Sequence, residues 1–157
     1  MYSDRVKEVQ KVLFMTMREG YAGSASKGTI ADMPGSKTIP FEFGDFKVLD
    51  CYLVNSYYSA GQTIIWDKDV PVWIMSYQGW YAKDAIPFLK QALWETYSKN
   101  EFLGGRGPNC FRSGEMIYIN TVESPNDFRH FRGREEVFGR HDLSIGWHEY
   151  QGLFLPT

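Results

Sequence analysis

The chain has 157 residues, of which 43% are hydrophobic, 17% aromatic and 23% charged, and its formal net charge is −2. A chain of this length suits one domain whose core is stable without disulfides or a structural metal, so we expect residues 1–157 to form a single domain. The slightly acidic balance argues against direct binding to nucleic acid or to a membrane surface, and no apolar run is long enough for a membrane-spanning helix. The expected location is therefore the cytoplasm.

The first element predicted along the chain is a helix over residues 4–19. Its apolar side chains recur at spacings of three and four, which is typical of a helix with one buried face. We expect Ser3 to cap its first turn and Gly20 to end it. Residues 21–37, rich in Gly, Ser and Thr, predict a long irregular segment that is either a functional flap or a mobile connection. The apolar positions of the helix are Val6, Val9, Leu13 and Met17.

Two β-hairpins are predicted next. The first spans residues 38–54 and reverses at Gly44 and Asp45, where glycine suits a tight turn. The second joins residues 62–66 to residues 70–77 through an Asp-Lys-Asp turn. Together they predict a meander of four strands.

A second helix and further strands follow. Asp84 suits the N-cap of a helix whose apolar face continues to Thr96. Strands are predicted again over residues 115–121, 128–134 and 143–155. Because short turns join successive strands and no strand-helix-strand alternation is present, the predicted fold class is α+β. We expect two packed helices and an antiparallel sheet of about eight strands, either strongly bent or partly closed into a barrel.

Two segments of the chain echo each other. Residues 73–79 read Trp-Ile-Met-Ser-Tyr-Gln-Gly, and residues 147–152 read Trp-His-Glu-Tyr-Gln-Gly. Each follows a charged turn and ends a predicted pair of strands, which favours two similar β-units. The two short matches leave open whether the chain contains a true repeat.

The basic residues are segregated along the chain. Every lysine lies at or before Lys99, and the basic residues after it are all arginines. Arginine suits planar pairing with carboxylates or phosphates, so the pattern indicates either an internal ion-pair network or an anion-binding groove. The residues expected to form such a groove are Arg106, Arg132 and Arg134.

Metal and cofactor signals are weak. His130, His141 and His148 match no known spacing of metal ligands, and the glycine-rich loop around Arg106 lacks the Lys-Ser/Thr step of a P-loop. We therefore expect neither a metal nor a cofactor.

Signals for catalysis are equally sparse. The chain has no Gly-x-Ser-x-Gly elbow, and Cys51 and Cys110 have no evident histidine partner, so both are expected to be buried, reduced thiols. Glu135 and Glu149 are a conceivable pair for acid/base hydrolysis. The balance is against an enzyme, and a small acid/base hydrolase is the alternative function.

The abundance of Trp and Tyr is the leading functional feature, because these side chains combine an apolar body with a polar tip. It predicts an aromatic-lined cleft that binds a small molecule or a protein partner, with Arg106 and Glu135 at its polar edge. A structural or self-associating protein, including a homodimer, is the third possibility. The predicted site residues are Trp73, Tyr77, Arg106, Arg132, Glu135, Trp147 and Tyr150.

A family resemblance rests on Tyr52 and on residues 71–79, 88–93, 106–108 and 131–135, in that order. These segments resemble a bacterial domain of unknown function that is found alone or behind the helix-turn-helix of some XRE-type transcription regulators. The resemblance covers about residues 14–154. It implies a sensory or partner-binding accessory domain that acts through a ligand or another protein, and it brings no assigned catalytic residue or cofactor.

This chain departs from the family pattern after Tyr52. The pattern has glycines and acidic residues there, whereas this chain has Leu53, Val54 and Asn55. An acidic site shared with the family is therefore not expected at this position.

Overall fold

The computed structural model describes residues 2–20, 26–104, 106–123 and 127–155. Within them the chain forms two α-helices, α1 (Tyr2–Glu19) and α2 (Ala85–Tyr97), and one short 3₁₀ helix, η1 (Arg140–Asp142). The strands are β1 (Gly28–Ile30), β2 (Met33–Phe43), β3 (Phe46–Asn55), β4 (Tyr58–Asp67), β5 (Val70–Tyr81), β6 (Cys110–Ser113), β7 (Met116–Val122), β8 (His130–Phe138) and β9 (Ser144–Phe154).

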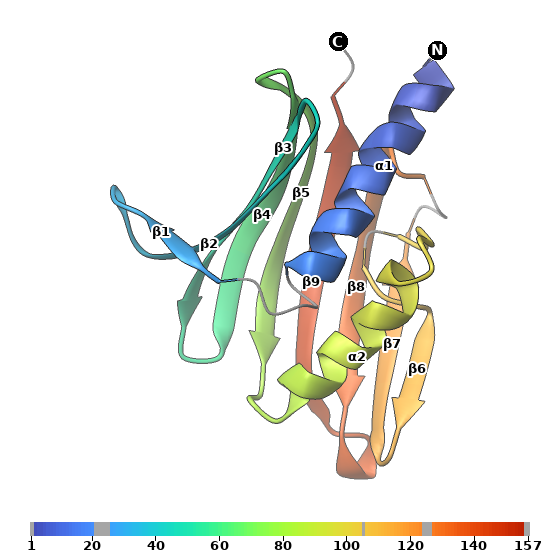
Figure 1. The fold of residues 1–157 in the computed structure, drawn as a ribbon. Coiled ribbons are helices and arrows are strands. Elements are labelled where there is room, and N and C mark those ends of the chain that lie inside the picture. Colours follow the sequence, from blue (N-terminus) through green and yellow to red (C-terminus); the bar gives the residue numbers. More distant parts are fainter. Residues whose placement is uncertain (1, 21–25, 105, 124–126, 156–157) are drawn as a thin grey trace.

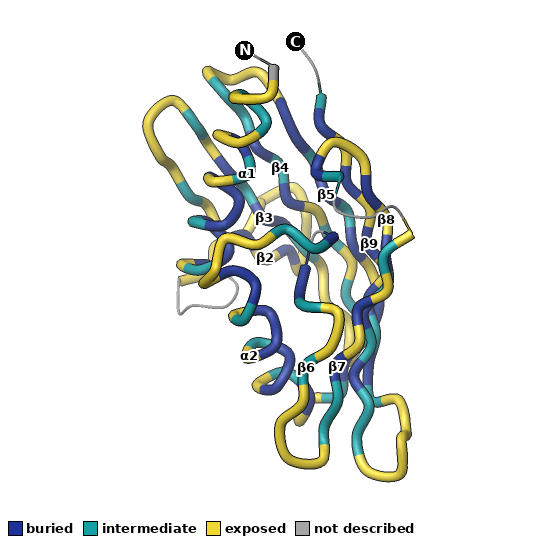
Figure 2. Tube along the Cα trace, turned by 90° about the vertical axis from the view of Figure 1, so that its right-hand side faces the viewer, coloured by how far each residue is buried: buried dark blue, intermediate teal, exposed yellow. Residues whose placement is uncertain are grey.

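The strands form one antiparallel sheet in the order β1-β2-β3-β4-β5-β9-β8-β7-β6. Both helices lie on the same face of this sheet (Figure 1), and β2 and β3 curve toward the side that the helices occupy (Figure 2). The predicted α+β class, the antiparallel sheet and the two packed helices are confirmed. The sheet is open, however, because β1 and β6 are its two edges and do not pair with each other, so the alternative of a partly closed barrel is wrong.

The two halves of the chain have the same order of elements, a helix followed by a meander of four strands. The first half is α1, then the short β1, then the meander β2 to β5, and the second half is α2 with β6 to β9. Their last strands, β5 and β9, pair in the middle of the sheet, where Tyr77 lies opposite Tyr150 and Trp80 lies opposite Trp147. The echoed segments are thus neighbours related by an approximate two-fold axis.

The core lies between the helices and the sheet. Strand alternation sends every second side chain toward the helices, so Trp73, Met75 and Tyr77 of β5 are buried while the residues between them face the opposite side. Trp73 is fully buried, stacks on Phe128 at 5.1 Å between ring centroids and donates its Nε1–H to the Phe128 carbonyl. The helices contribute the buried residues Val9, Val12, Leu13, Phe14, Met17, Phe88, Leu89, Ala92, Leu93 and Tyr97.

The tight turns form as predicted. Gly44 is at a φ of 59° between paired Phe43 and Phe46, and Lys68 and Asp69 are both at positive φ between β4 and β5. Two consecutive residues at positive φ match the twist of the flanking strands, which is why the two-residue reversal closes the second hairpin.

Several local predictions are corrected. The first helix begins at Tyr2, so Ser3 lies inside it and is not its cap. Residues 28–30 and 33–37 belong to β1 and β2, because they pair with each other and β2 continues along β3, so the predicted irregular segment is wrong there. Its residues 21–25 lie outside the described residues. Strand β6 was not predicted, and Cys110, which it contains, is exposed rather than buried because an edge strand has one unprotected side.

In the described part of the chain, neither helix is both long and apolar enough to cross a membrane.

Candidate functional site

A cavity of about 250 Å³ lies on the helix side of the sheet, between the first residues of α2 and strands β3, β4, β5 and β9. We call it the inner pocket. Tyr77 and Tyr81 reach it from β5 because residues four apart on a strand face the same side. The side chains lining it are Lys27, Lys37, Tyr52, Val54, Ser56, Tyr57, Ser59, Tyr77, Tyr81, Lys83, Ile86, Lys90, Arg106 and His148.

A buried ion pair stands at the inner end of this pocket. Arg106 forms it with Glu135 of β8, with 2.7 Å between Arg106 Nε and Glu135 Oε1, and both side chains are almost fully excluded from solvent. Tyr81 donates its hydroxyl to Oε1 at 2.9 Å and Tyr118 donates its hydroxyl to Oε2 at 2.6 Å. Both carboxylate oxygens therefore have partners, which offsets the cost of burying the charge.

The hydroxyl of Tyr118 also ties the glycine-rich loop to the sheet. It accepts the backbone N–H of Gly107 at 3.0 Å, and burial, together with the charge of Glu135, raises the pKa of Tyr118 well above its ordinary value. Asn120 donates its side-chain amide to the Gly107 carbonyl at 3.0 Å. These contacts hold the loop so that Arg106 points into the core.

The two halves carry matching buried tyrosine contacts. Tyr77 donates its hydroxyl to Asp50 Oδ1 at 2.8 Å, and Tyr150 donates its hydroxyl to Asn120 Oδ1 at 2.5 Å. Asp50 also accepts the hydroxyl of Thr63 at 2.8 Å. Burial raises the pKa of Asp50, although these two hydroxyl donors and the charge of Arg106 oppose the change. Burial likewise raises the pKa of Tyr150.

His148 connects the pocket to the buried acid. Its Nε2 lies 3.0 Å from Ser59 Oγ, and its ring packs against Tyr77 and Tyr81 at centroid distances of 5.7 and 4.8 Å. Its Nδ1 is buried without a hydrogen-bond partner among the described residues and lies 4.0 Å from Glu135 Oε1. Burial, and secondly the charge of Arg106, lowers the pKa of His148 to about 3, so the imidazole is neutral at ordinary pH.

Ser59, His148 and Glu135 follow the order of a serine-histidine-acid triad, but their geometry and electrostatics differ from one. A distance of 4.0 Å is too long for a hydrogen bond from His148 Nδ1 to Glu135, whose oxygens already have other partners. A histidine with a pKa near 3 is also a weak general base at neutral pH. The arrangement can donate or accept hydrogen bonds to a ligand more readily than it can activate the serine.

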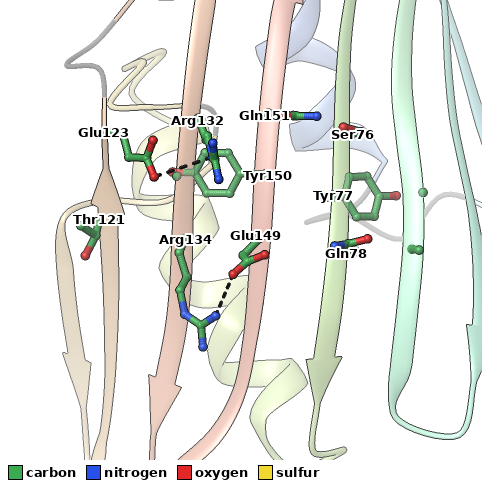
Figure 3. Close-up of a pocket in the computed structure, with 13 residues that line it drawn as sticks. Ser76, Tyr77, Gln78, Thr121, Glu123, Arg132, Arg134, Glu149, Tyr150 and Gln151 are labelled. Atoms are coloured by element: carbon green, nitrogen blue, oxygen red, sulfur yellow. Dashed lines mark hydrogen bonds and ion pairs between the residues drawn. The ribbon is translucent and has the colours of Figure 1, made fainter.

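A second concavity, of about 660 Å³, lies on the face of the sheet opposite the helices; we call it the outer groove. Figure 3 shows Arg132 beside Glu123 and Arg134 beside Glu149 there. Arg134 Nη1 is 3.0 Å from Glu149 Oε1, and its guanidinium lies 4.3 Å from the ring centroid of Trp147. Arg132 Nε is 3.7 Å from Glu123. The arginine charges of this groove are thus balanced by neighbouring acids.

The predicted site residues divide between the two faces of the sheet. Arg106 lines the inner pocket and Tyr77 borders both cavities, whereas Arg132 lines the outer groove and Trp147 is stacked under Arg134 on the same outer face. The three arginines proposed for one groove are therefore not together.

The remaining predicted residues are buried. Trp73 belongs to the core, Tyr150 is held by Asn120 and borders the outer groove, and Glu135 lies beneath the inner pocket rather than at its edge. Glu149 cannot act with Glu135 as an acid/base pair, because Glu149 pairs across the sheet with Arg134 and its side chain is half exposed on the outer face.

Sequence reasoning missed several pocket residues. Ser59 and His148 come from strands far apart in the chain, and only a correct strand register brings them together. The sequence contained one indication of the lysines around the pocket, because every lysine of the chain lies within residues 1–99. Across the described residues, no group of three or more His, Cys, Asp or Glu side chains is placed to hold a metal ion.

The fold and the pocket define an open-sheet α+β domain with a buried polar recess under its second helix. Its sequence matches, over residues 50–153, the model of a family described as a domain of unknown function, DUF5680. The match covers more than half of the chain, so the protein belongs to this family. A search of the curated proteins and a search of the solved structures found no match.

Proposed function

We propose that this protein binds a small molecule in the inner pocket. The observation that carries the proposal is a half-open pocket of about 250 Å³ in which tyrosine rings lie beside the buried polar groups of Arg106 and His148. Binding sites for small molecules combine mostly apolar walls with a few fixed polar groups in this way. The volume is below the roughly 300 to 1,000 Å³ typical of drug-sized ligands, so the ligand is expected to be small.

The polar groups of the pocket are held in place before any ligand arrives. Arg106 is fixed by Glu135, and His148 is fixed between Ser59 and the two tyrosine rings. Fixed groups lose little freedom on binding, which favours affinity. The resemblance to accessory domains of helix-turn-helix regulators supports a sensory use of this pocket.

A thermal-shift screen of the purified protein against metabolites tests the proposal. A ligand at one hundred times its dissociation constant adds about 2.7 kcal/mol to the free energy of unfolding, which raises the midpoint by several degrees. Ile86→Trp at the pocket wall should remove the shift produced by a hit, and Gln91→Trp, at an exposed position of α2, should keep it. A shift that survives Ile86→Trp would place the ligand elsewhere and contradict the proposal.

A small hydrolase is the second candidate, favoured by the 3.0 Å contact between Ser59 and His148. Hydrolysis of p-nitrophenyl acetate by the wild type and by Ser59→Ala separates the two functions. Equal rates would agree with a binding site. Turnover that depends on Ser59 and rises with pH near neutrality would favour the hydrolase. Such a rise would show that His148 acts as a general base and that its pKa lies well above about 3.

A further inference from the structure

We propose that the ligand of the inner pocket is a small anion, a carboxylate or a phosphate, whose charged group is held by lysines at the pocket wall. This inference rests on the proposed function and adds the chemical class of the ligand. It is carried by the gathering of cationic side chains around one cavity.

Four lysines line the inner pocket, and they come from separate parts of the chain. Lys27 precedes β1, Lys37 lies in β2, Lys83 precedes α2 and Lys90 lies within α2. No acidic side chain is among the described residues that line the pocket. This local excess contrasts with the whole chain, in which 19 acidic residues outnumber 17 basic ones.

Three of the five lysines that lie outside the pocket, Lys47, Lys68 and Lys99, have acidic partners among the described residues. Lys47 pairs with Asp69 at 2.6 Å, and Lys99 pairs with Glu95 at 3.2 Å. None of the four pocket lysines has an ion-pair partner within 4.0 Å among the residues that the structure describes. Their mutual repulsion is therefore compensated mainly by solvent and counterions, and a bound anion would relieve it.

The buried groups beneath the pocket do not supply the missing negative charge. Glu135 is already paired with Arg106. Asp50 is the other buried carboxyl, and its charged form interacts with Arg106 and Lys27. A single carboxyl group set below the surface cannot balance four lysines at the wall, so the pocket keeps a net positive field.

The rest of the lining defines the uncharged part of the ligand. Tyr52, Tyr57 and Tyr81 supply ring faces and Ile86 supplies an aliphatic wall, which suits a flat or apolar body. Ser59 and the neutral His148 are placed to hydrogen-bond a further polar atom. Flexible lysine stems can adjust to either a carboxylate or a phosphate, unlike the fixed fork of an arginine.

The test compares charged and uncharged molecules that share one aromatic ring, at constant ionic strength in Tris chloride. The pairs are benzoate with benzamide and phenyl phosphate with phenol, and inorganic phosphate is added as a bare anion. Binding is measured by calorimetry and thermal shift on the intact protein. We expect the anion of a pair to bind at least tenfold more tightly than its neutral partner, and the preferred pair identifies a carboxylate or a phosphate.

Variants that remove lysine charges test whether the pocket lysines cause the preference for anions. Lys37→Gln with Lys90→Gln should weaken anion binding at least tenfold, whereas Lys7→Gln with Lys68→Gln, which removes the same charge outside the pocket, should leave it unchanged. In the absence of ligand and at low ionic strength, the first double variant should melt at a higher temperature than the wild type, since it relieves repulsion. If the first double variant neither weakens anion binding nor raises the melting temperature, the proposal that the ligand is an anion is overturned.

The remaining outcomes separate this inference from the proposed function. Neutral molecules that bind as tightly as anions, and that Ile86→Trp blocks, would overturn the anionic class while supporting a small-molecule pocket. No binding by these probes and no hit in the metabolite screen would overturn both.

Discussion

Glu135 shows how a residue that resembles a catalytic acid in the sequence can be part of the framework. Its carboxylate accepts hydroxyls from Tyr81 and Tyr118 and pairs with Arg106, all in the interior. Replacing one member of such a buried pair leaves the other charge without compensation. We therefore expect Glu135 to contribute to the free energy of unfolding.

Glu135→Gln is expected to lower the free energy of unfolding by about 3 to 5 kcal/mol, because it leaves the Arg106 charge buried without its partner. Urea denaturation followed by tryptophan fluorescence measures the change. Glu136→Gln on the same strand, whose side chain is partly exposed on the outer face, serves as the control and should cost less than about 1 kcal/mol. Equal effects of the two substitutions would show that the buried ion pair is not a major stabilising contact.

Asp50 and Asn120 offer a comparison within one molecule, because each accepts a tyrosine hydroxyl at the same place in its half. The pKa of Asp50 is raised above its ordinary value of 3.8, mainly by burial. A raised pKa means that Asp50 favours folding below its unfolded-state pKa and that this contribution is lost as the pH rises through the folded-state pKa. At neutral pH the charged Asp50 therefore weakens the fold.

Asp50→Asn should raise the urea midpoint at pH 7, since it keeps an oxygen for the Tyr77 hydroxyl and removes the buried charge. The gain should shrink as the pH falls through the raised pKa of Asp50, where the wild-type carboxylate takes up its proton. Asp32→Asn, at an exposed turn, should change the midpoint at neither pH. A gain that stays constant with pH would contradict the role assigned to the Asp50 charge.

At the scale of elements, the central strands pack closely because glycines face aromatic rings on neighbouring strands. Gly152 of β9 lies opposite Phe131 of β8, and a Cβ at Gly152 would overlap the Phe131 ring. Gly133 of β8 is placed in the same way against the ring of Tyr150. These glycines let the rings lie flat on the sheet beneath the helices.

Gly152→Ala is expected to cost about 1 to 3 kcal/mol, because the added methyl group must displace the ring of Phe131 from a packed core. Gly139→Ala is the matched control, since its added Cβ would meet only ordinary contacts near 3.4 Å with Ile145. Thermal melts of both variants measure the difference. Unchanged stability in Gly152→Ala would mean that the ring can move without loss.

The elements that sequence reasoning predicted best are those with local signals. The two hairpins follow from turn residues, and the helices follow from apolar periodicity. Strand β6 and residues 28–37 were missed because they lie at or near sheet edges, where one side of a strand is exposed and the alternation of apolar residues is weak. Their strand character comes from pairing with neighbours rather than from composition.

The site was predicted less well for a physical reason. Tyr77 and Arg106 line a pocket, but the face of the sheet on which a residue lies depends on register, and a shift of one residue reverses it. Arg132 and Trp147 were consequently grouped with residues that lie on the other side of the sheet. The lysines gather only when segments between residue 27 and residue 90 are folded together.

At the scale of the whole molecule, one sheet unites the two halves. The pairing of β5 with β9 and the shared core beneath α1 and α2 leave neither half with a complete hydrophobic interior. The inner pocket is not repeated symmetrically: Asp50 beneath it corresponds to Asn120, and Thr63 corresponds to Glu135. The polar recess therefore uses residues in which the two halves differ.

The repeated order of elements also makes the fold cyclic in principle. The chain passes from β5 into α2, and α1 begins at the same end of the sheet at which β9 ends (Figure 1), so a linker from β9 to α1 would copy that passage. A circularly permuted chain that starts at Asp84 and ends at Lys83, with a short glycine-serine linker, is expected to fold and to melt cooperatively. Its new ends would lie in the wall of the inner pocket, where Lys83 and Ile86 stand. Retained folding with a lost ligand response would separate the residues that hold the architecture from those that recognise the ligand.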